Sequence, residues 1–265
     1  MSIYKLLTVQ FSALLVGLGA VFTVTEYSRV QAQQPDGNTT IEEVAESEAT
    51  IGEEVTVRGE VEDVESGVSF AIESDGLFES ERVLVINVSE QVVPEYADDL
   101  KLQVTGEVAN LVLADVERDY GLDLDPELYV DYEEQPVILA TYMVQSPEID
   151  EVSSNPENYY GQEIAIEGEV DEIRNAFAFT LEEEQLIGGE DLLLINAAVE
   201  PIPEEGETVV VTGIVRPFVK AELERDYDLT WDLDVQTEIE AEYSEKPVLV
   251  VDRIYPSAQE EGILE

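Results

Sequence analysis

The chain has 265 residues, of which 44% are hydrophobic, so it can bury the core of one large domain or of two domains of ordinary size. It contains no Cys and no His, which excludes disulfides, thiolate nucleophiles and metal sites built on Cys or His. Its formal net charge is -50, so its surface should repel nucleic acid and anionic lipid.

This charge also indicates the surroundings that suit the protein. Self-repulsion opposes a compact state, and salt screens it, because the Debye length falls to ~3 Å at 1 M. We therefore expect halophilic adaptation to a salt-rich extracytoplasmic environment. A solvated acidic surface with no specific role is compatible with the same composition.

The N-terminal residues 1–32 have the pattern of an export signal. Lys5 stands in a short polar start, residues 6–25 are largely apolar, and Val30 and Ala32 occupy the two positions that signal peptidase reads. We expect cleavage after Ala32. The alternative is an uncleaved membrane anchor formed by residues 6–25, since ~20 apolar residues can span a bilayer.

Residues 33–40 follow the signal and are polar, with Pro and Gly among them, so they are predicted to form a disordered linker. After the linker, one pattern occurs twice with the same internal spacing. Val104–Val108 followed by Ala114–Tyr120 corresponds to Val211–Val215 followed by Ala221–Tyr227. The chain is therefore predicted to be one unit written twice, with a first repeat over 41–146, a second repeat over 147–256 and a tail over 257–265.

Each repeat is predicted to contain five strands. Apolar residues alternate with others in most of them, and the third strand is a continuous apolar run, which indicates burial on both faces. A glycine stands at the same point of the first and fourth strands, where it usually marks a bulge or a sharp bend. The predicted strands are Val55–Val61, Val68–Ile72, Val83–Asn87, Leu102–Val108 and Pro136–Tyr142 in the first repeat, and Ile164–Val170, Phe177–Leu181, Leu192–Asn196, Val209–Val215 and Pro247–Arg253 in the second.

A short helix is predicted between the fourth and fifth strands, at Ala114–Tyr120 and again in its copy. Ala114, Val116 and Tyr120 could share its buried face, with the charged residues on the other side. An acidic stretch follows the helix in both repeats.

Five short strands with glycine-marked bends look like a small, highly curved barrel of the OB type. The strands Val57–Val61 and Val211–Val215, with Val on either side of a Gly, resemble those of secreted bacterial OB-fold-like domains. The resemblance covers both repeats. It implies an all-β fold with short helices, built as two tandem OB-like five-stranded barrels, and it brings no catalytic signature.

The first candidate site is the block Glu117–Tyr120, repeated as Glu224–Tyr227. Arg is scarce in this chain, so the reuse of Arg118 and Arg225 at one point suggests a specific partner. One interpretation is contact with an anion or a substrate. The favoured interpretation is an internal ion pair that fixes the helix against the barrel, with the carboxylates of Glu117 and Glu224 close by.

Closely spaced carboxylates around this block raise calcium as a second candidate, because calcium binds six to eight oxygens at ~2.4 Å. The spacing of an EF-hand is not met. The candidate ligands are Asp119, Asp123, Asp125, Asp226, Asp228 and Asp232. No other cofactor is expected.

Aromatic residues form a third candidate. Phe70 and Phe179 are expected in the core, whereas Phe218 and Trp231 are candidates for a ligand-stacking surface. Single-stranded nucleic acid, a common ligand of OB barrels, requires a positive channel and is rejected on charge.

No nucleophile elbow, phosphate loop or zinc motif is present, so we do not expect an enzyme. We expect an exported, non-catalytic binding or scaffold protein of the cell envelope, periplasmic or secreted, whose partner is an unidentified protein or envelope ligand. The alternatives are a calcium- or cation-responsive envelope protein and a carboxylate-based hydrolase. Membrane contact is expected only if the N-terminal segment is uncleaved.

Overall fold

The computed structural model describes residues 38–46, 50–62, 66–74, 81–89, 91, 100–183, 191–197, 201–227, 233–244 and 246–258. The first repeat contains α1 (Ile41–Glu46), β1 (Glu54–Val61), β2 (Ser69–Glu73), β3 (Arg82–Asn87), β4 (Lys101–Asn110), α2 (Leu113–Tyr120), the 3-10 turns η2 (Pro126–Leu128) and η3 (Val130–Tyr132), and β5 (Pro136–Gln145). The second contains α3 (Ile149–Ser154), η4 (Pro156–Asn158), β6 (Glu163–Asn175), β7 (Ala178–Glu182), β8 (Leu192–Ile195), β9 (Thr208–Pro217), α4 (Lys220–Tyr227), α5 (Leu233–Tyr243) and β10 (Pro247–Pro256). All ten predicted strands are therefore confirmed, to within a few residues at their ends.

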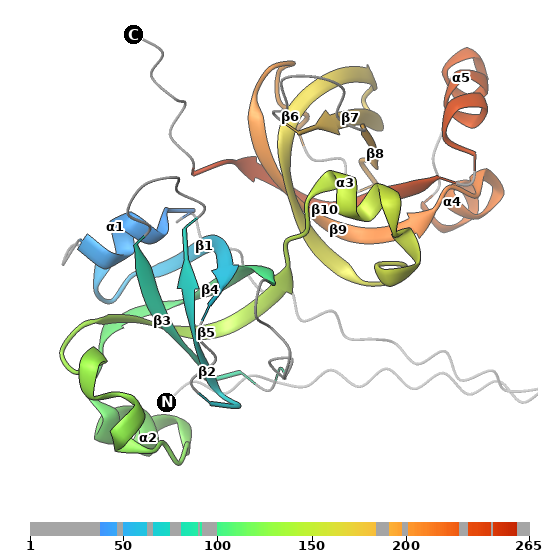
Figure 1. Ribbon diagram of the computed structural model, residues 1–265. Coiled ribbons are helices and arrows are strands. Elements are labelled where there is room, and N and C mark those ends of the chain that lie inside the picture. Colours follow the sequence, from blue (N-terminus) through green and yellow to red (C-terminus); the bar gives the residue numbers. More distant parts are fainter. Residues whose placement is uncertain are drawn as a thin grey trace, which may run out of the picture. The chain divides into compact units, whose positions relative to one another are not determined.

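Strands β1 to β5 form a closed five-stranded barrel (Figure 1). Strand β1 pairs antiparallel with β2 and with β4, β2 pairs with β3, β3 runs parallel to β5, and β5 pairs antiparallel with β4. This ring is compatible with an OB-like fold.

The strands of the second repeat pair in the same order. Strand β6 pairs with β7 and with β9, β7 pairs with β8, β8 runs parallel to β10, and β10 pairs antiparallel with β9. A single pair, Gln145 with Ile164, continues from β5 into β6.

Each repeat has its own apolar core, and a short helix before the first strand contributes to it. Phe70 is buried in the first core and Phe179 in the second, as predicted. Helix α1 adds Ile41 and Val44 to the first core, and α3 adds its own buried pair of apolar residues to the second. The sequence marked these two segments as the starts of the repeats and did not identify them as helices.

The glycines of the fourth strands lie opposite β-bulges. The register between β4 and β5 shifts between Thr105 and Gly106, and the register between β9 and β10 shifts at Gly213 in the same way. A Cβ atom at either glycine would overlap a carbonyl oxygen of the neighbouring strand. At Gly59 and Gly168 no bulge occurs, and each glycine instead allows close approach of a carbonyl from β2 or β7.

The N-terminal end of the described chain lies against β1. The amide of Thr39 donates to the carbonyl oxygen of Thr56 at 3.0 Å, and the Asn38 side chain donates to the Pro256 carbonyl oxygen at 2.7 Å. The remainder of the predicted linker, residues 33–37, lies outside the described residues, as do the predicted signal at 1–32 and most of the tail. None of the helices that the structure describes is long and apolar enough to cross a bilayer.

Candidate functional site

The connection between β4 and β5 packs on the outside of the barrel and forms a second apolar layer there. Strand β3 is covered by the core on one face and by this connection on the other, as its apolar run predicted. The layer consists of Leu111, Leu113, Val116, Leu124 and Tyr129 from the connection, packed on Leu84, Ile86, Val137 and Leu139 from β3 and β5.

Hydrogen bonds hold this connection in one conformation. The Tyr129 ring is 1% exposed, and its hydroxyl lies 2.8 Å from the hydroxyl of Ser69 on β2. The carboxylate of Glu117 accepts the amide of Leu124 at 3.2 Å, which ties α2 to the turn that follows it. Gly121, with φ of 70°, ends α2 in the left-handed region that favours glycine. The connection therefore forms a fixed platform on the barrel.

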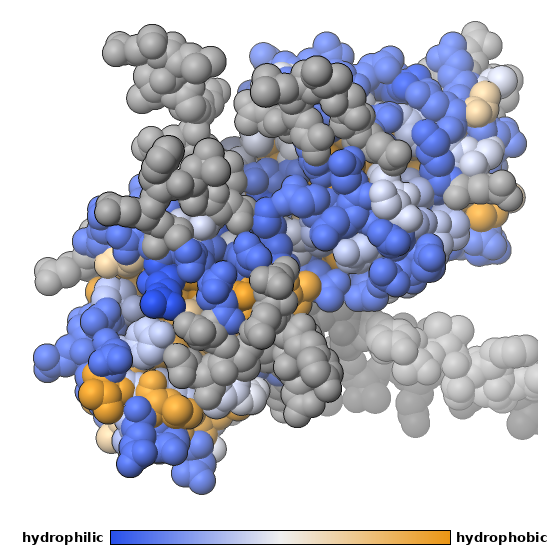
Figure 2. Space-filling view, viewed as in Figure 1, coloured by the Kyte–Doolittle hydropathy of each residue, from blue (hydrophilic) through white to orange (hydrophobic). Residues whose placement is uncertain are grey.

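The outer side of this platform exposes apolar residues. Among the residues that the structure describes, four of the six exposed large hydrophobic side chains lie here. These four, which we call the α2 patch, are Val112 (45% exposed), Tyr120 (43%), Leu128 (39%) and Val130 (67%). Figure 2 shows apolar residues gathered at the lower left, over α2 and the turns after it. Exposed apolar surface rimmed by polar residues marks interaction sites.

Helix α2 is present where the sequence predicted it, but its buried face differs from the prediction. Leu113 and Val116 are buried, whereas Ala114 and Tyr120 are exposed. The helix begins at Leu113, one residue earlier than predicted, and Leu113 is the first residue of its buried face. Tyr120 is its last residue, directly before Gly121, at which the helix ends.

The side chains around the α2 patch are predominantly negative. Residues 111–135 contain nine acidic side chains and one basic side chain, that of Arg118. The Arg118 guanidinium, 64% exposed, pairs with Asp115 at 2.6 Å and with Asp119 at 2.8 Å. Its hydrogen bond lowers the pKa of Asp119. The predicted ion pair between helix and barrel is therefore wrong for Arg118, which pairs within its own helix.

In the second repeat, the corresponding ion pair comes from a residue that the sequence did not single out. Arg225, 68% exposed, pairs with its neighbour Asp226, and Glu224 is half-buried on the same helix. Arg216 from β9 reaches Asp226 at 2.9 Å and lies over the ring of Tyr227. Hydrogen bonds from Arg225 and Arg216 lower the pKa of Asp226. The scarcity of Arg could have drawn attention to Arg216, five residues before the predicted helix at Ala221.

The aromatic stacking surface is not supported at Phe218. This side chain is 6% exposed and packs in an outer apolar layer with Leu223, Ile239 and Tyr243, because the connection from β9 to β10 folds back over its strands. Helix α5, which the sequence did not predict, supplies two of these residues, and the Tyr243 hydroxyl donates to Asp191. Trp231 lies outside the described residues.

The structure does not assemble the calcium candidates that it describes into a metal site. Asp119 and Asp226 are engaged by arginines, Asp125 caps η2 by accepting the amide of Glu127 at 3.0 Å, and Asp123 is exposed. Asp228 and Asp232 lie outside the described residues. Within the described ranges, no group of three or more carboxylates is placed to hold a metal ion.

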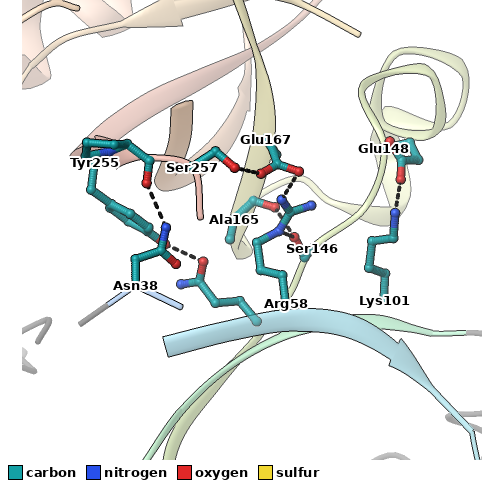
Figure 3. Close-up of polar contacts among 11 residues, drawn as sticks. Asn38, Arg58, Lys101, Ser146, Glu148, Ala165, Glu167, Tyr255 and Ser257 are labelled. Carbon is teal, nitrogen blue, oxygen red and sulfur yellow. Dashed lines mark hydrogen bonds and ion pairs between the residues drawn. The ribbon is translucent and has the colours of Figure 1, made fainter. Parts of the chain in front are cut away.

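A polar cluster that the sequence did not indicate joins the two repeats (Figure 3). Arg58 of β1 pairs with Glu167 of β6, and its Nε donates to Ser146 at 2.8 Å. The Ser146 hydroxyl in turn donates to the carbonyl oxygen of Ala165 at 3.0 Å. The side chains of Arg58 and Glu167 are 12% and 15% exposed, so this ion pair is shielded from solvent.

Further contacts extend this junction. The hydroxyl of Tyr255 donates to the Gln103 side chain, which is fully buried, and Lys101 pairs with Glu148. Both contacts join residues of different repeats. Ser146, predicted as the boundary between the repeats, is thus a buried part of the contact between them.

No protein-family model matches this chain. No curated protein matches it either. Among solved structures, it is similar to a chain described as "Structural mimicry for functional antagonism", with a TM-score of 0.24 and 10% identity, over 76% of this chain and 89% of that chain. A likeness at this level carries no argument about function.

Proposed function

We propose that the chain is built as two tandem OB-like barrels and acts as an exported, non-catalytic binding or scaffold protein of the cell envelope. The repeated strand order, β1 to β5 and then β6 to β10, supports the tandem arrangement. The proposed location is periplasmic or secreted, with no cofactor, and the proposed partner is a protein or another envelope ligand.

The observation that carries this proposal is the pattern of covered and exposed apolar surface. In both repeats the outer face of the sheet is covered, and in the first repeat the covering connection itself exposes apolar side chains. OB barrels bind their ligands on the face of strands two and three and on the loops beside it. Here the outer apolar side chains of β3 and β8 are covered by the chain's own connections. Among the described residues, most of the exposed large apolar side chains lie on the first connection, in the α2 patch. Exposed apolar surface rimmed by polar residues is typical of sites that bind a macromolecular partner, whereas a small molecule needs a concave site.

The acidic surface fits the same proposal. A net charge of -50 keeps an exported protein soluble where salt screens its self-repulsion. It also disfavours nucleic acid as the partner.

Site-specific photo-crosslinking in the native cells tests this function. A photoreactive amino acid at Val130, in the full chain, should give a discrete adduct in the envelope fraction. The same amino acid at Glu107, an exposed residue of β4, serves as the control. Export is read separately, as a mature N-terminus at Gln33. Retention in the cytoplasm, or equal adducts at the two positions, would contradict the proposal.

A further inference from the structure

We propose that the α2 patch binds a basic amphipathic segment of a partner protein, in which one or two large apolar side chains are flanked by Lys or Arg. This inference rests on the proposed function and specifies the chemistry of the partner. Three properties of the patch support it: its rigid support, the charge around it and its absence from the other repeat.

The patch presents its apolar side chains on a support that is already ordered. Tyr129, buried beneath it, is hydrogen-bonded to Ser69, and Glu117 fixes the turn after α2 through the amide of Leu124. A preorganised surface loses little conformational entropy on binding. Val130, the first residue of η3, is 67% exposed and has the largest exposed fraction of the four patch residues.

The negative charge around the patch favours a partner segment that carries positive charge. Nine carboxylates and one guanidinium lie within residues 111–135, and Arg118 is already paired with Asp115 and Asp119. Lys or Arg beside an apolar anchor would meet this rim with opposite charge. A second copy of this chain would bring two acidic rims together, which costs free energy.

The second repeat does not carry the same surface in its described residues. The position that corresponds to Val112 is Val219, which is 41% exposed, and Phe218 beside it is buried. The connection 218–246 carries three basic and ten acidic residues, against one and nine over 111–135, so both connections are strongly acidic. Among the described residues, the group of exposed apolar side chains that forms the α2 patch therefore occurs in the first repeat and not in the second.

Salt should affect the two parts of this interaction differently. Charge attraction weakens as the Debye length falls from ~10 Å at 0.1 M to ~3 Å at 1 M, whereas apolar contact does not weaken with salt. We expect the affinity to fall several-fold between 0.05 and 0.5 M NaCl and then to level off.

Calorimetric titration of the purified mature chain with synthetic peptides tests this inference. The probe peptide carries two Leu flanked by Lys, and two control peptides replace the Lys by Glu or the Leu by Ser. We expect only the first to bind. Val130→Ser should weaken its binding about 5- to 10-fold, because an apolar anchor loses its contact. Val219→Ser, the corresponding kind of change in the second repeat, should leave it unchanged.

Several results would overturn the inference. One is binding of the Glu peptide at equal strength, and another is equal loss of binding in the two Ser variants. A third is sedimentation of the wild-type chain as a dimer that Val130→Ser dissociates, which would make a second copy the occupant. An unchanged melting temperature shows that Val130→Ser still folds. If the adduct at Val130 forms in cells but no basic peptide binds, the binding function stands and this partner chemistry is wrong.

Discussion

Gly106 and Gly213 show how one missing side chain shapes each sheet. Each lies in the fourth strand of its repeat, opposite a bulge in the fifth, at a point where a Cβ would overlap the neighbouring backbone. We predict that Gly106→Ala lowers the free energy of unfolding by about 1–3 kcal/mol, because the strands must separate to admit the methyl group. Urea unfolding measures this change.

Gly67 provides the matched control for this substitution. It is exposed in the turn before β2, and a Cβ there meets nothing within 4 Å. Gly67→Ala should leave the free energy of unfolding unchanged or raise it slightly, since Ala restricts the unfolded chain. Equal losses in the two variants would contradict the role of close strand approach.

At this scale, the sequence predicted those residues whose role follows from local pattern. The repeated Val-Thr-Gly pattern marked both bulge glycines, because a Gly inside a strand has few other uses. Phe218 was misassigned, since its burial depends on Ile239 and Tyr243, which lie far along the chain in a helix that was not predicted. Contacts between distant segments leave no local periodicity to read.

Tyr129 helps to attach the connection after β4 to the barrel. The Tyr129 hydroxyl lies 2.8 Å from the hydroxyl of Ser69, which is fully buried. We predict that Tyr129→Phe lowers the free energy of unfolding by about 1 kcal/mol, the usual net contribution of one hydrogen bond. Urea unfolding checks this, with Tyr120→Phe as the control, since Tyr120 is 43% exposed and its hydroxyl should matter little. An unchanged midpoint in Tyr129→Phe would show that packing alone attaches the connection.

Strands β6 and β7 place two carboxylates opposite each other, Glu169 and Glu182. Desolvation, with the charges of Asp171, Glu169 and Asp191, raises the pKa of Glu182. A raised pKa in the folded state means that the ionised carboxylate opposes folding, so stability is lost as the pH rises through this pKa. Below the pKa of the unfolded chain, ~4.3, Glu182 is neutral in both states and the effect disappears.

We therefore predict that Glu182→Gln stabilises the protein by about 0.2–1 kcal/mol at pH 7, and by less as the pH approaches 4. Thermal unfolding at several pH values measures the difference. Glu238→Gln, exposed on α5, corrects for the loss of one negative charge. A gain that is equal at pH 7 and pH 4 would show that repulsion between the strands is not its cause.

Among the elements, the strands and helices α2 and α4 could be predicted, whereas α1, α3 and α5 could not. Strands repeat an apolar residue at every second position, and two copies of each made the pattern clearer. Helices α1 and α3 have six residues each, with two buried apolar positions three apart, too few to distinguish a helical period. Helix α5 could not be predicted because it begins in the acidic stretch that both repeats share, and in the first repeat this stretch forms short 3-10 turns.

At the scale of the whole molecule, Arg58 is the residue on which the contact between the repeats most depends. We predict that Arg58→Met lowers the free energy of unfolding by up to about 3 kcal/mol, because the shielded carboxylate of Glu167 loses its counter-charge. The double variant with Glu167→Met should recover part of the loss. Urea unfolding of both variants measures this.

Arg118→Met is the control for loss of a guanidinium. This pair is exposed within one helix, where solvent screens it, so its loss should leave the free energy of unfolding nearly unchanged. Equal effects of Arg58→Met and Arg118→Met would show that the junction is no stronger than a surface ion pair.

The repeats themselves could be predicted from the sequence, whereas the contact between them could not. Arg58 and Glu167 occupy the same position of their repeats, directly before the glycine of the first strand, with opposite charges. In an alignment of the repeats this difference is one substitution among many. Only the placement of β1 beside β6 shows that the two charges face each other.

The hydrogen bond from Asn38 to Pro256 brings the start of the described chain to the end of its last strand. Termini that meet in this way allow a protein to be circularly permuted. A short loop could join Pro256 to Asn38, and the chain could be reopened at the exposed turn around Gly206, with every strand pairing preserved. Fusion partners attached at Asn38 and at Pro256 would accordingly start from the same point of the surface.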